Sequence, residues 1–444
     1  MKNIKYTIIL FCLFQSCNKL DIKPDLSRVV PSTLDDFQGL LDNTDGIFNV
    51  SYVNYGEIAC ADYHIDYQDY QSNFTPLTSQ VYVWNIKDLN DPYFVDWNTS
   101  YSRILQCNIV LDGLISNRTL ESNEPFKNVK GQALFHRAHS FFMLAEEFAQ
   151  VYDEANLDKP ALPLRTSSDI NINYPLSSVR DTYGLIINDL KVASALLPES
   201  QLYKTRPSKP AAYALLARVF LAKGDYTNAL IYADSCLSMK SDLMDFNDLN
   251  ENSDYPINQF NKEVLFQGSI SYDHLLSRNV LRINSSLLDL YESNDLRRNI
   301  LFFKRDDGSF GFKGNYNGVE INSIFGGIAT DEILLVQTEC NARKNNISLA
   351  LEGLNKLLKK RYKNTSFVPL NITNQEVLLR RVLLERRKEL LFRGLRWTDL
   401  RRLNKDSRFE VTLTRELNGQ TYTLQPNDPS YVFPIPKYVT TITF

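Results

Sequence analysis

The chain has 444 residues, of which 43% are hydrophobic, 23% are charged and 12% are aromatic. This composition is typical of a globular protein and excludes disorder over most of the length, because the apolar fraction is large enough to offset chain entropy. Lys and Arg total 49 against 52 Asp and Glu, which gives a net charge of -3. A dedicated nucleic-acid-binding protein carries an excess of basic residues, so the charge balance disfavours nucleic acid as a partner.

The first seventeen residues are typical of a bacterial lipoprotein signal. A short basic start precedes the mostly apolar run Tyr6–Phe14, which is too short to span a bilayer as a helix. The small residue Ser16 is followed at once by Cys17, the order found where such a signal is cleaved and the new N-terminal cysteine is acylated. We expect residues 1–16 to be a signal peptide and Cys17 to carry the lipid anchor; a plain secreted protein is the alternative.

The other cysteines of the mature chain show no C-x-x-C pair and no spacing typical of a disulfide framework. The sequence therefore predicts free, buried thiols at Cys60, Cys107, Cys236 and Cys340.

Apolar residues recur at spacings of three and four over much of the chain, which predicts a mainly α protein. The segments with this periodicity are 97–114, 131–151, 177–197, 209–239, 331–360 and 374–393. Residues 209–239, with Gly224 at the turn and Ala229 after it, are similar to a tetratricopeptide repeat, and residues 333–358 form a weaker copy with Asn345 at the turn. We expect helical repeats at about 97–240 and 331–403 in one unit that spans 17–444.

Two insertions, at about 50–96 and 255–327, and a C-terminal segment, 410–444, interrupt this pattern with irregular or strand-like sequence. Asp306-Asp307-Gly308 between two strand-like runs predicts a β-hairpin in the second insertion. The predicted architecture is thus a tetratricopeptide-like scaffold of helix pairs with irregular and short β-hairpin insertions.

The first insertion is rich in aromatic residues, with twelve among positions 52–101. Flat aromatic rings stack on the C–H faces of sugars, while neighbouring polar groups bond the hydroxyls. Tyr82 and Trp84 alternate with valines, which in an extended chain would place both rings on one face. The predicted ligand-binding residues are Trp84, Tyr67, Tyr70, Tyr82 and Asp66. The alternative is that most of these rings fill a core, and we expect that role for Trp97 and Tyr101.

Two short segments that contain histidine hold side chains of the types that can bind metal ions. Asp62, His64 and Asp66 would share a face in an extended chain, but no fourth ligand is in view, so we expect a solvated or sugar-contacting loop and no metal site. His136 and His139 fall on a predicted helix with an apolar stripe and are expected to be structural.

Four segments, in the right order, carry a resemblance to a known family. They are Cys17 followed by Leu20-Asp21-x-x-Pro24, the helix from Thr205 to Tyr226, the signature from Glu385 to Leu403, and the Ile-Pro segment that starts at Phe433. Together they resemble the SusD/RagB family of outer-membrane lipoproteins of Bacteroidetes, across nearly the whole mature chain.

The resemblance implies a helical scaffold of tetratricopeptide-like pairs, with the less regular insertions carrying the ligand face. It implies a non-catalytic lipoprotein, anchored in the outer membrane and facing the cell exterior, that captures glycans and delivers them to a SusC-like TonB-dependent channel. It implies no cofactor and no fixed set of binding residues, so the five candidate residues rest on composition alone.

The signature from Glu385 to Leu403 is rich in arginine, but acidic residues are interleaved at helical spacings. This favours a buried network of ion pairs over a nucleic-acid surface. The catalytic motifs H-E-x-x-H, G-x-S-x-G, the phosphate loop and G-x-G-x-x-G are all absent from the sequence. Two alternatives stay open: a mainly helical lipoprotein glycoside hydrolase, and capture of a non-glycan nutrient such as peptides.

Overall fold

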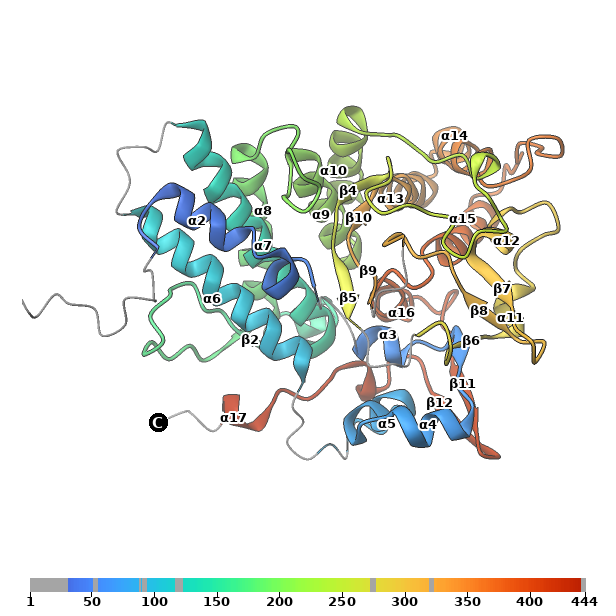
Figure 1. Cartoon of the computed structure of the whole chain (residues 1–444), viewed down its shortest axis with the longest axis horizontal. Helices are drawn as coiled ribbons and strands as arrows, with labels where there is room; N and C mark the ends of the chain where they lie inside the picture. Colours follow the sequence, from blue (N-terminus) through green and yellow to red (C-terminus); the bar gives the residue numbers. More distant parts are fainter. Residues whose placement is uncertain are drawn as a thin grey trace, which may run out of the picture.

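The computed structural model describes residues 31–50, 55–87, 89, 94–115, 123–271, 277–318 and 323–440. Helices dominate these residues, and the strands, two to five residues long, form only two-stranded sheets (Figure 1). The mainly α fold predicted from periodicity is therefore confirmed. The predicted signal peptide and Cys17 lie outside the described residues. None of the helices in the described ranges combines the length and the apolar character needed to cross a bilayer.

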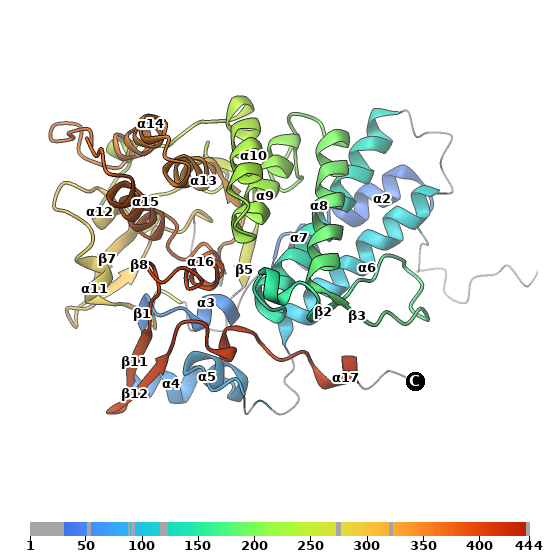
Figure 2. The same ribbon diagram turned by 180° about the vertical axis from the view of Figure 1, so that it is seen from behind.

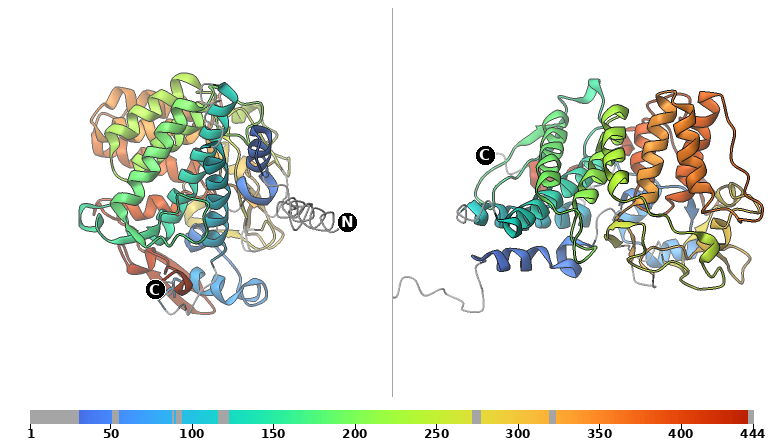
Figure 3. Two further views of the ribbon diagram at one scale, coloured as in Figure 1. Left: turned by 90° about the vertical axis from the view of Figure 1, so that its left-hand side faces the viewer. Right: turned by 90° about the horizontal axis from the view of Figure 1, so that it is seen from above.

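Nine helices of the described ranges build the scaffold, and from α6 to α15 each packs against the next. They are α6 (Val95–Ile115), α7 (Glu124–Phe148), α8 (Val179–Leu196), α9 (Lys209–Ala222), α10 (Tyr226–Met239), α13 (Thr330–Arg343), α14 (Ile347–Leu358), α15 (Gln375–Glu389) and α16 (Arg396–Leu403). Helix α10 packs directly against α13, although about ninety residues separate them along the chain. The scaffold is therefore continuous across the second insertion, as the view from above shows (Figure 3).

Both predicted repeat pairs are confirmed. Helices α9 and α10 meet at a turn in which Gly224 has a φ of 76°, a conformation that glycine adopts without steric cost. Asp225 then caps α10 by accepting a hydrogen bond from the Asn228 backbone N–H at 3.0 Å. Asn345, with a φ of 61°, takes the place of the glycine between α13 and α14.

The insertions, the connection between α7 and α8, and the chain ends supply short elements around the scaffold. The helices are α2 (Leu34–Leu41), α3 (Tyr55–Ala59), α4 (Tyr67–Asn73), α5 (Pro76–Tyr82), α11 (Ser285–Leu288), α12 (Arg297–Leu301) and α17 (Lys437–Thr440). The paired strands are β1 (Tyr63–His64) with β6 (Arg282–Ile283), β2 (Pro160–Pro163) with β3 (Leu176–Ser178), β4 (Val264–Phe266) with β10 (Ile328–Ala329), β5 (Ser269–Ser271) with β9 (Ser323–Phe325), β7 (Phe302–Lys304) with β8 (Phe310–Phe312), and β11 (Leu413–Leu417) with β12 (Gln420–Leu424).

Two of these pairings bear on the sequence analysis. The β7–β8 hairpin turns at Gly308, whose φ is 84°, so the hairpin predicted there is confirmed. The β1–β6 pair joins the first insertion to the second, with His64 opposite Arg282. Segments more than 200 residues apart in the sequence thus lie side by side.

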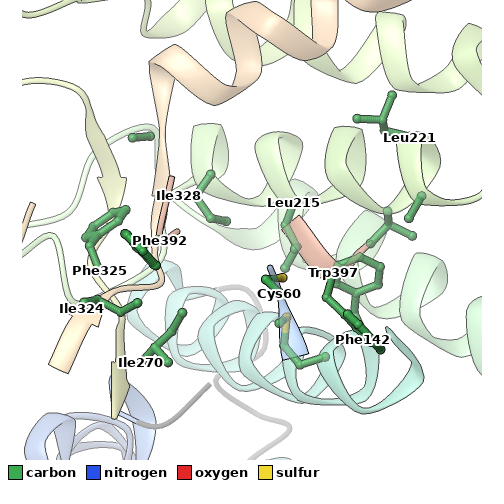
Figure 4. Close-up of a cluster of buried hydrophobic side chains, with 14 of the residues drawn as sticks. Cys60, Phe142, Leu215, Leu221, Ile270, Ile324, Phe325, Ile328, Phe392 and Trp397 are labelled. Carbon is green, nitrogen blue, oxygen red and sulfur yellow. The ribbon is translucent and has the colours of Figure 1, made fainter. Parts of the chain in front are cut away.

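The largest of the hydrophobic clusters among the described residues joins the scaffold to both insertions. Phe142 and Leu215 from α7 and α9 belong to the same cluster as Ile270, Phe325 and Trp397 (Figure 4). The four described cysteines are free and buried, as predicted. His136 and His139 are buried among aromatic rings in α7, which confirms a structural role for both.

The arginine-rich signature forms the predicted network of buried ion pairs. Arg402 donates to Glu339 at 2.7 and 2.8 Å and to Asp399 at 2.8 Å, and Arg386 binds the same Asp399. Because these side chains are buried and pair with one another, they link helices α13, α15 and α16 inside the protein.

Candidate functional site

Two of the five predicted ligand-binding residues, Tyr82 and Trp84, are buried. Their side chains are 0% and 5% exposed. The extended chain that the alternation suggested is wrong, because Thr75 and Pro76 start helix α5 there. Thr75 accepts a hydrogen bond from the Thr78 backbone N–H at 3.1 Å, and proline at the first helical position is pre-organised for a helix.

Both rings contact Arg415, which comes from strand β11. The Trp84 indole N–H donates to the Ala59 carbonyl oxygen at 2.8 Å, and the Arg415 guanidinium lies 5.2 Å from the Trp84 ring centre. Arg415 also donates to the carbonyl oxygens of Ile58, Cys60 and Tyr82. The two rings therefore enclose a buried cation and present no face to a ligand in this conformation.

Tyr67 and Tyr70 lie one helical turn apart on α4, at the surface. Tyr67 is 39% exposed, and its ring stacks on that of Tyr70 with centres 6.3 Å apart and an interplanar angle of 17°. Tyr70 is half-buried against Phe74 and Tyr82 and donates to the Ser79 carbonyl oxygen at 3.3 Å. Burial raises the pKa of Tyr70 above its usual value. Tyr67 thus offers an open ring, and Tyr70 anchors it to the core.

Asp66, the residue before α4, binds a cation from the second insertion. Arg282 Nη2 lies 2.7 Å from an Asp66 carboxylate oxygen, while its other nitrogens lie 3.2 Å from Asp69 and 3.5 Å from Asp307. Arg282 and Asp66 meet because β1 pairs with β6, at the edge of the molecule where α4 and α5 lie (Figure 1). We call Asp66, Tyr67, Asp69, Tyr70, Arg282 and Asp307 the Tyr67 surface.

The side chains of Asp62, His64 and Asp66, which could ligate a metal in an extended chain, contact different partners. Asp62 pairs with Arg387 and Arg396, and His64 Nδ1 lies 2.8 Å from Asn284 Oδ1. Asp66 is held by Arg282. Across the described ranges, His, Cys, Asp and Glu side chains form no group of three or more that could hold a metal ion.

Arg282 and Asp307 are the members of the Tyr67 surface that sequence reasoning missed. Asp307 was predicted as a turn residue, which it is, but its carboxylate also faces Arg282. Neither residue carries a sequence signal for this role, since more than 200 positions separate them from Asp66. The pairing of β1 with β6, which brings Arg282 to Asp66, is visible only in the structure.

Comparison with known proteins shows the family to which this protein belongs. Residues 19–221 match a SusD-like family model described as "Starch-binding associating with outer membrane", and residues 330–441 match the model of the SusD family. The chain belongs to the SusD/RagB family, as its four sequence segments predicted.

Known proteins are similar to this one over most of its length. SusD-like protein P2 of Formosa agariphila is 25% identical, over 69% of this chain and 71% of that one. A putative sugar binding protein from Bacteroides vulgatus has a similar structure, with a TM-score of 0.76 and 22% identity over 93% of this chain and 97% of that one. A SusD superfamily protein from Bacteroides thetaiotaomicron gives a TM-score of 0.74 and 22% identity over 92% and 98%. These structural likenesses establish the fold.

Proposed function

We propose that this protein binds oligosaccharides at the Tyr67 surface. The observation that carries the proposal is the exposed, supported ring of Tyr67 beside Arg282 and three carboxylates. A pyranose ring can stack on the tyrosine, while carboxylate and guanidinium groups bond its hydroxyls. The description of the matching family model, which mentions starch, and the names of similar proteins, which mention sugar or carbohydrate, support a glycan ligand.

The proposal includes the cellular setting. Residues 17–444 act as one glycan-binding unit, lipid-anchored through Cys17 to the outer membrane on its external face. From there the protein delivers glycans to a SusC-like TonB-dependent channel. The sequence of the first seventeen residues and the outer-membrane description of the family model support this setting. Metabolic labelling with palmitate tests the anchor: the wild type incorporates label and Cys17→Ala does not. Co-purification of the channel with the tagged lipoprotein tests the partner, and its failure would remove the delivery step.

The binding is non-catalytic in this proposal. A glycoside hydrolase needs one carboxyl group that stays protonated to act as a general acid. At the Tyr67 surface, hydrogen bonds from Ser309 and the nearby Arg282 lower the pKa of Asp307. A carboxylate of this kind suits hydroxyl binding better than proton donation. Chromatography of a glycan panel after incubation with the protein is expected to show no product, and any turnover would favour the hydrolase alternative.

A glycan array tests the ligand class. The chain starting at Asn18 is expected to bind a subset of oligosaccharides, and Tyr67→Ala is expected to lose binding to that subset. Tyr203→Ala is a matched control, since Tyr203 is 56% exposed and lies in another part of the molecule. Binding to a parallel peptide library, with no glycan bound, would favour the peptide alternative.

A further inference from the structure

A groove outside the Tyr67 surface opens between α6, the loop before β3 and the C-terminal helix α17. It has a volume of about 350 Å³. Its lining residues are Trp97, Asn98, Tyr101, Pro163, Arg165, Ile170, Asn171, Ile172, Asn173, Tyr174, Tyr438 and Val439. In Figure 2, α17 lies below β2 and β3, at the edge of the molecule that also carries α4 and α5. We call this feature the Arg165 groove.

Hydrogen bonds fix the aromatic walls of the Arg165 groove. The Tyr101 hydroxyl donates to the Pro163 carbonyl oxygen at 2.9 Å, which holds a partly buried ring between α6 and β2. The Tyr438 hydroxyl donates to Asn98 Oδ1 at 2.9 Å and ties α17 to α6. The groove is therefore built from three separate parts of the chain with their rings held in place.

Arg165 gives the groove a positive charge that no ion pair within the described part of the chain neutralises. Its guanidinium lies 5.2 Å from the Tyr174 ring centre and donates to the Asp169 backbone carbonyl at 3.1 Å. The Asp169 carboxylate instead accepts hydrogen bonds from Asn171, at 2.9 and 3.0 Å. Among the described residues no Asp or Glu forms an ion pair with Arg165, whereas Arg282 at the Tyr67 surface faces three carboxylates.

The rest of the lining suits a ring with one apolar face and several hydroxyls. Ile170 and Ile172 stand exposed at the rim, and Asn171 and Asn173 alternate with them. Tyrosine rings stack on sugar C–H faces, and amide groups donate to and accept from hydroxyls. A planar guanidinium binds a carboxylate through two parallel hydrogen bonds.

We propose that the Arg165 groove is a second carbohydrate-binding site, selective for a uronic acid residue whose carboxylate pairs with Arg165. The sugar ring packs against the tyrosines, and the asparagines contact its hydroxyls. The proposal rests on the proposed function only in taking an oligosaccharide as ligand; it needs no residue of the Tyr67 surface. The terminal carboxylate of a peptide would pair with Arg165, but a peptide has no sugar ring to pack against the tyrosine side chains of the groove.

Isothermal titration calorimetry tests the proposal with short uronate oligosaccharides. The probes are trisaccharides of galacturonate, guluronate, mannuronate and glucuronate, each compared with its methyl ester, in which the carboxylate charge is replaced by a neutral ester. We expect at least one acid form to bind at least tenfold more tightly than its ester, with affinity that falls as salt rises. Arg165→Gln and Tyr174→Ala are each expected to weaken this binding at least tenfold.

Two controls separate this proposal from the proposed function. Arg180→Gln removes an exposed arginine of α8 that pairs with Asp158 at 3.3 Å, and it should leave affinity unchanged. Tyr67→Ala should also keep the uronate binding, while Arg165→Gln keeps whatever neutral glycan binds at the Tyr67 surface. Binding of no acid form, equal binding of acid and ester, or full affinity in Arg165→Gln would overturn the proposal. Preference for an acetylated tripeptide acid over all uronates would also overturn it.

Discussion

The guanidinium of Arg415 lies 3.7 Å from the ring centre of Tyr82, within the protein core. Arg415 belongs to the C-terminal hairpin and Tyr82 ends helix α5 of the first insertion, so a contact over 333 residues of sequence joins the tail to the aromatic segment. Much of the aromatic density in that insertion therefore serves the fold. Among the described residues of that insertion, Tyr67 keeps an exposed ring that a ligand can contact.

Replacing Arg415 by Met should destabilise the protein strongly. The substitution removes a desolvated cation–π contact and leaves the carbonyl oxygens of Ile58, Cys60 and Tyr82 without this donor. We expect the free energy of unfolding to fall by on the order of 3 kcal/mol or more. Denaturant unfolding measures this change. Arg380→Met, at an exposed arginine paired with Glu376, is the control, and equal stability losses in the two variants would contradict the account.

Arg297 is expected to be the most sensitive member of the buried ion-pair network. Its side chain is fully buried and pairs with Asp295 at 2.7 Å, Glu385 at 2.5 Å and Glu389 at 3.0 Å. Arg297→Met removes the cation that these three carboxylates share and leaves, among the described residues, only Lys388 and Arg361 as buried partners for them, which should cost about 3–5 kcal/mol of unfolding free energy. Thermal and urea unfolding provide the measurement. A loss no larger than that of the exposed Arg180→Met would show that the network does not stabilise the fold.

Stability should fall as pH rises towards 8, in part through Glu57. Burial, reinforced by the nearby Asp62, raises the Glu57 pKa to about 8, although the Gly394 backbone N–H donates to its carboxylate. Because the folded state holds this proton more tightly, the contribution is fully present below the unfolded pKa near 4.5 and is lost as pH rises through 8. It amounts to at most about 5 kcal/mol.

Glu57→Gln should flatten this pH dependence, since glutamine keeps the hydrogen bond without a proton to lose. The measurement is Tm at pH 5, 7 and 8.5. We expect the wild type to lose more Tm than the variant over this range, while the exposed Glu124→Gln follows the wild type. Parallel curves for wild type and Glu57→Gln would rule out Glu57 as a source of the effect.

The sequence predicted the scaffold well because helical periodicity and turn residues are local signals. Gly224 and Asn345 mark their turns without knowledge of anything distant. The alternation of Tyr82 and Trp84 with valines predicts an extended chain, which is wrong, because the helix start at Thr75-Pro76 sets the local conformation. That start was visible in the sequence and could have corrected the prediction.

The candidate sites depend on contacts that no local pattern encodes. Tyr67, Tyr70 and Asp66 were predicted from composition, and the structure places all three at one surface. Their partner Arg282 is brought there only by strand pairing. In the same way, Arg165 and Tyr438 line one groove although the sequence separates them by more than 270 positions, so no spacing rule could join them.

The central claim, glycan binding through the exposed ring of Tyr67, is tested most directly by one calorimetric titration. The tightest glycan from the array is titrated into the wild type, Tyr67→Ala and Tyr203→Ala, with Tm measured for each. Loss of one stacked ring should weaken affinity about tenfold in Tyr67→Ala, with an unchanged Tm, and Tyr203→Ala should bind as the wild type does. Wild-type affinity in Tyr67→Ala would contradict the account.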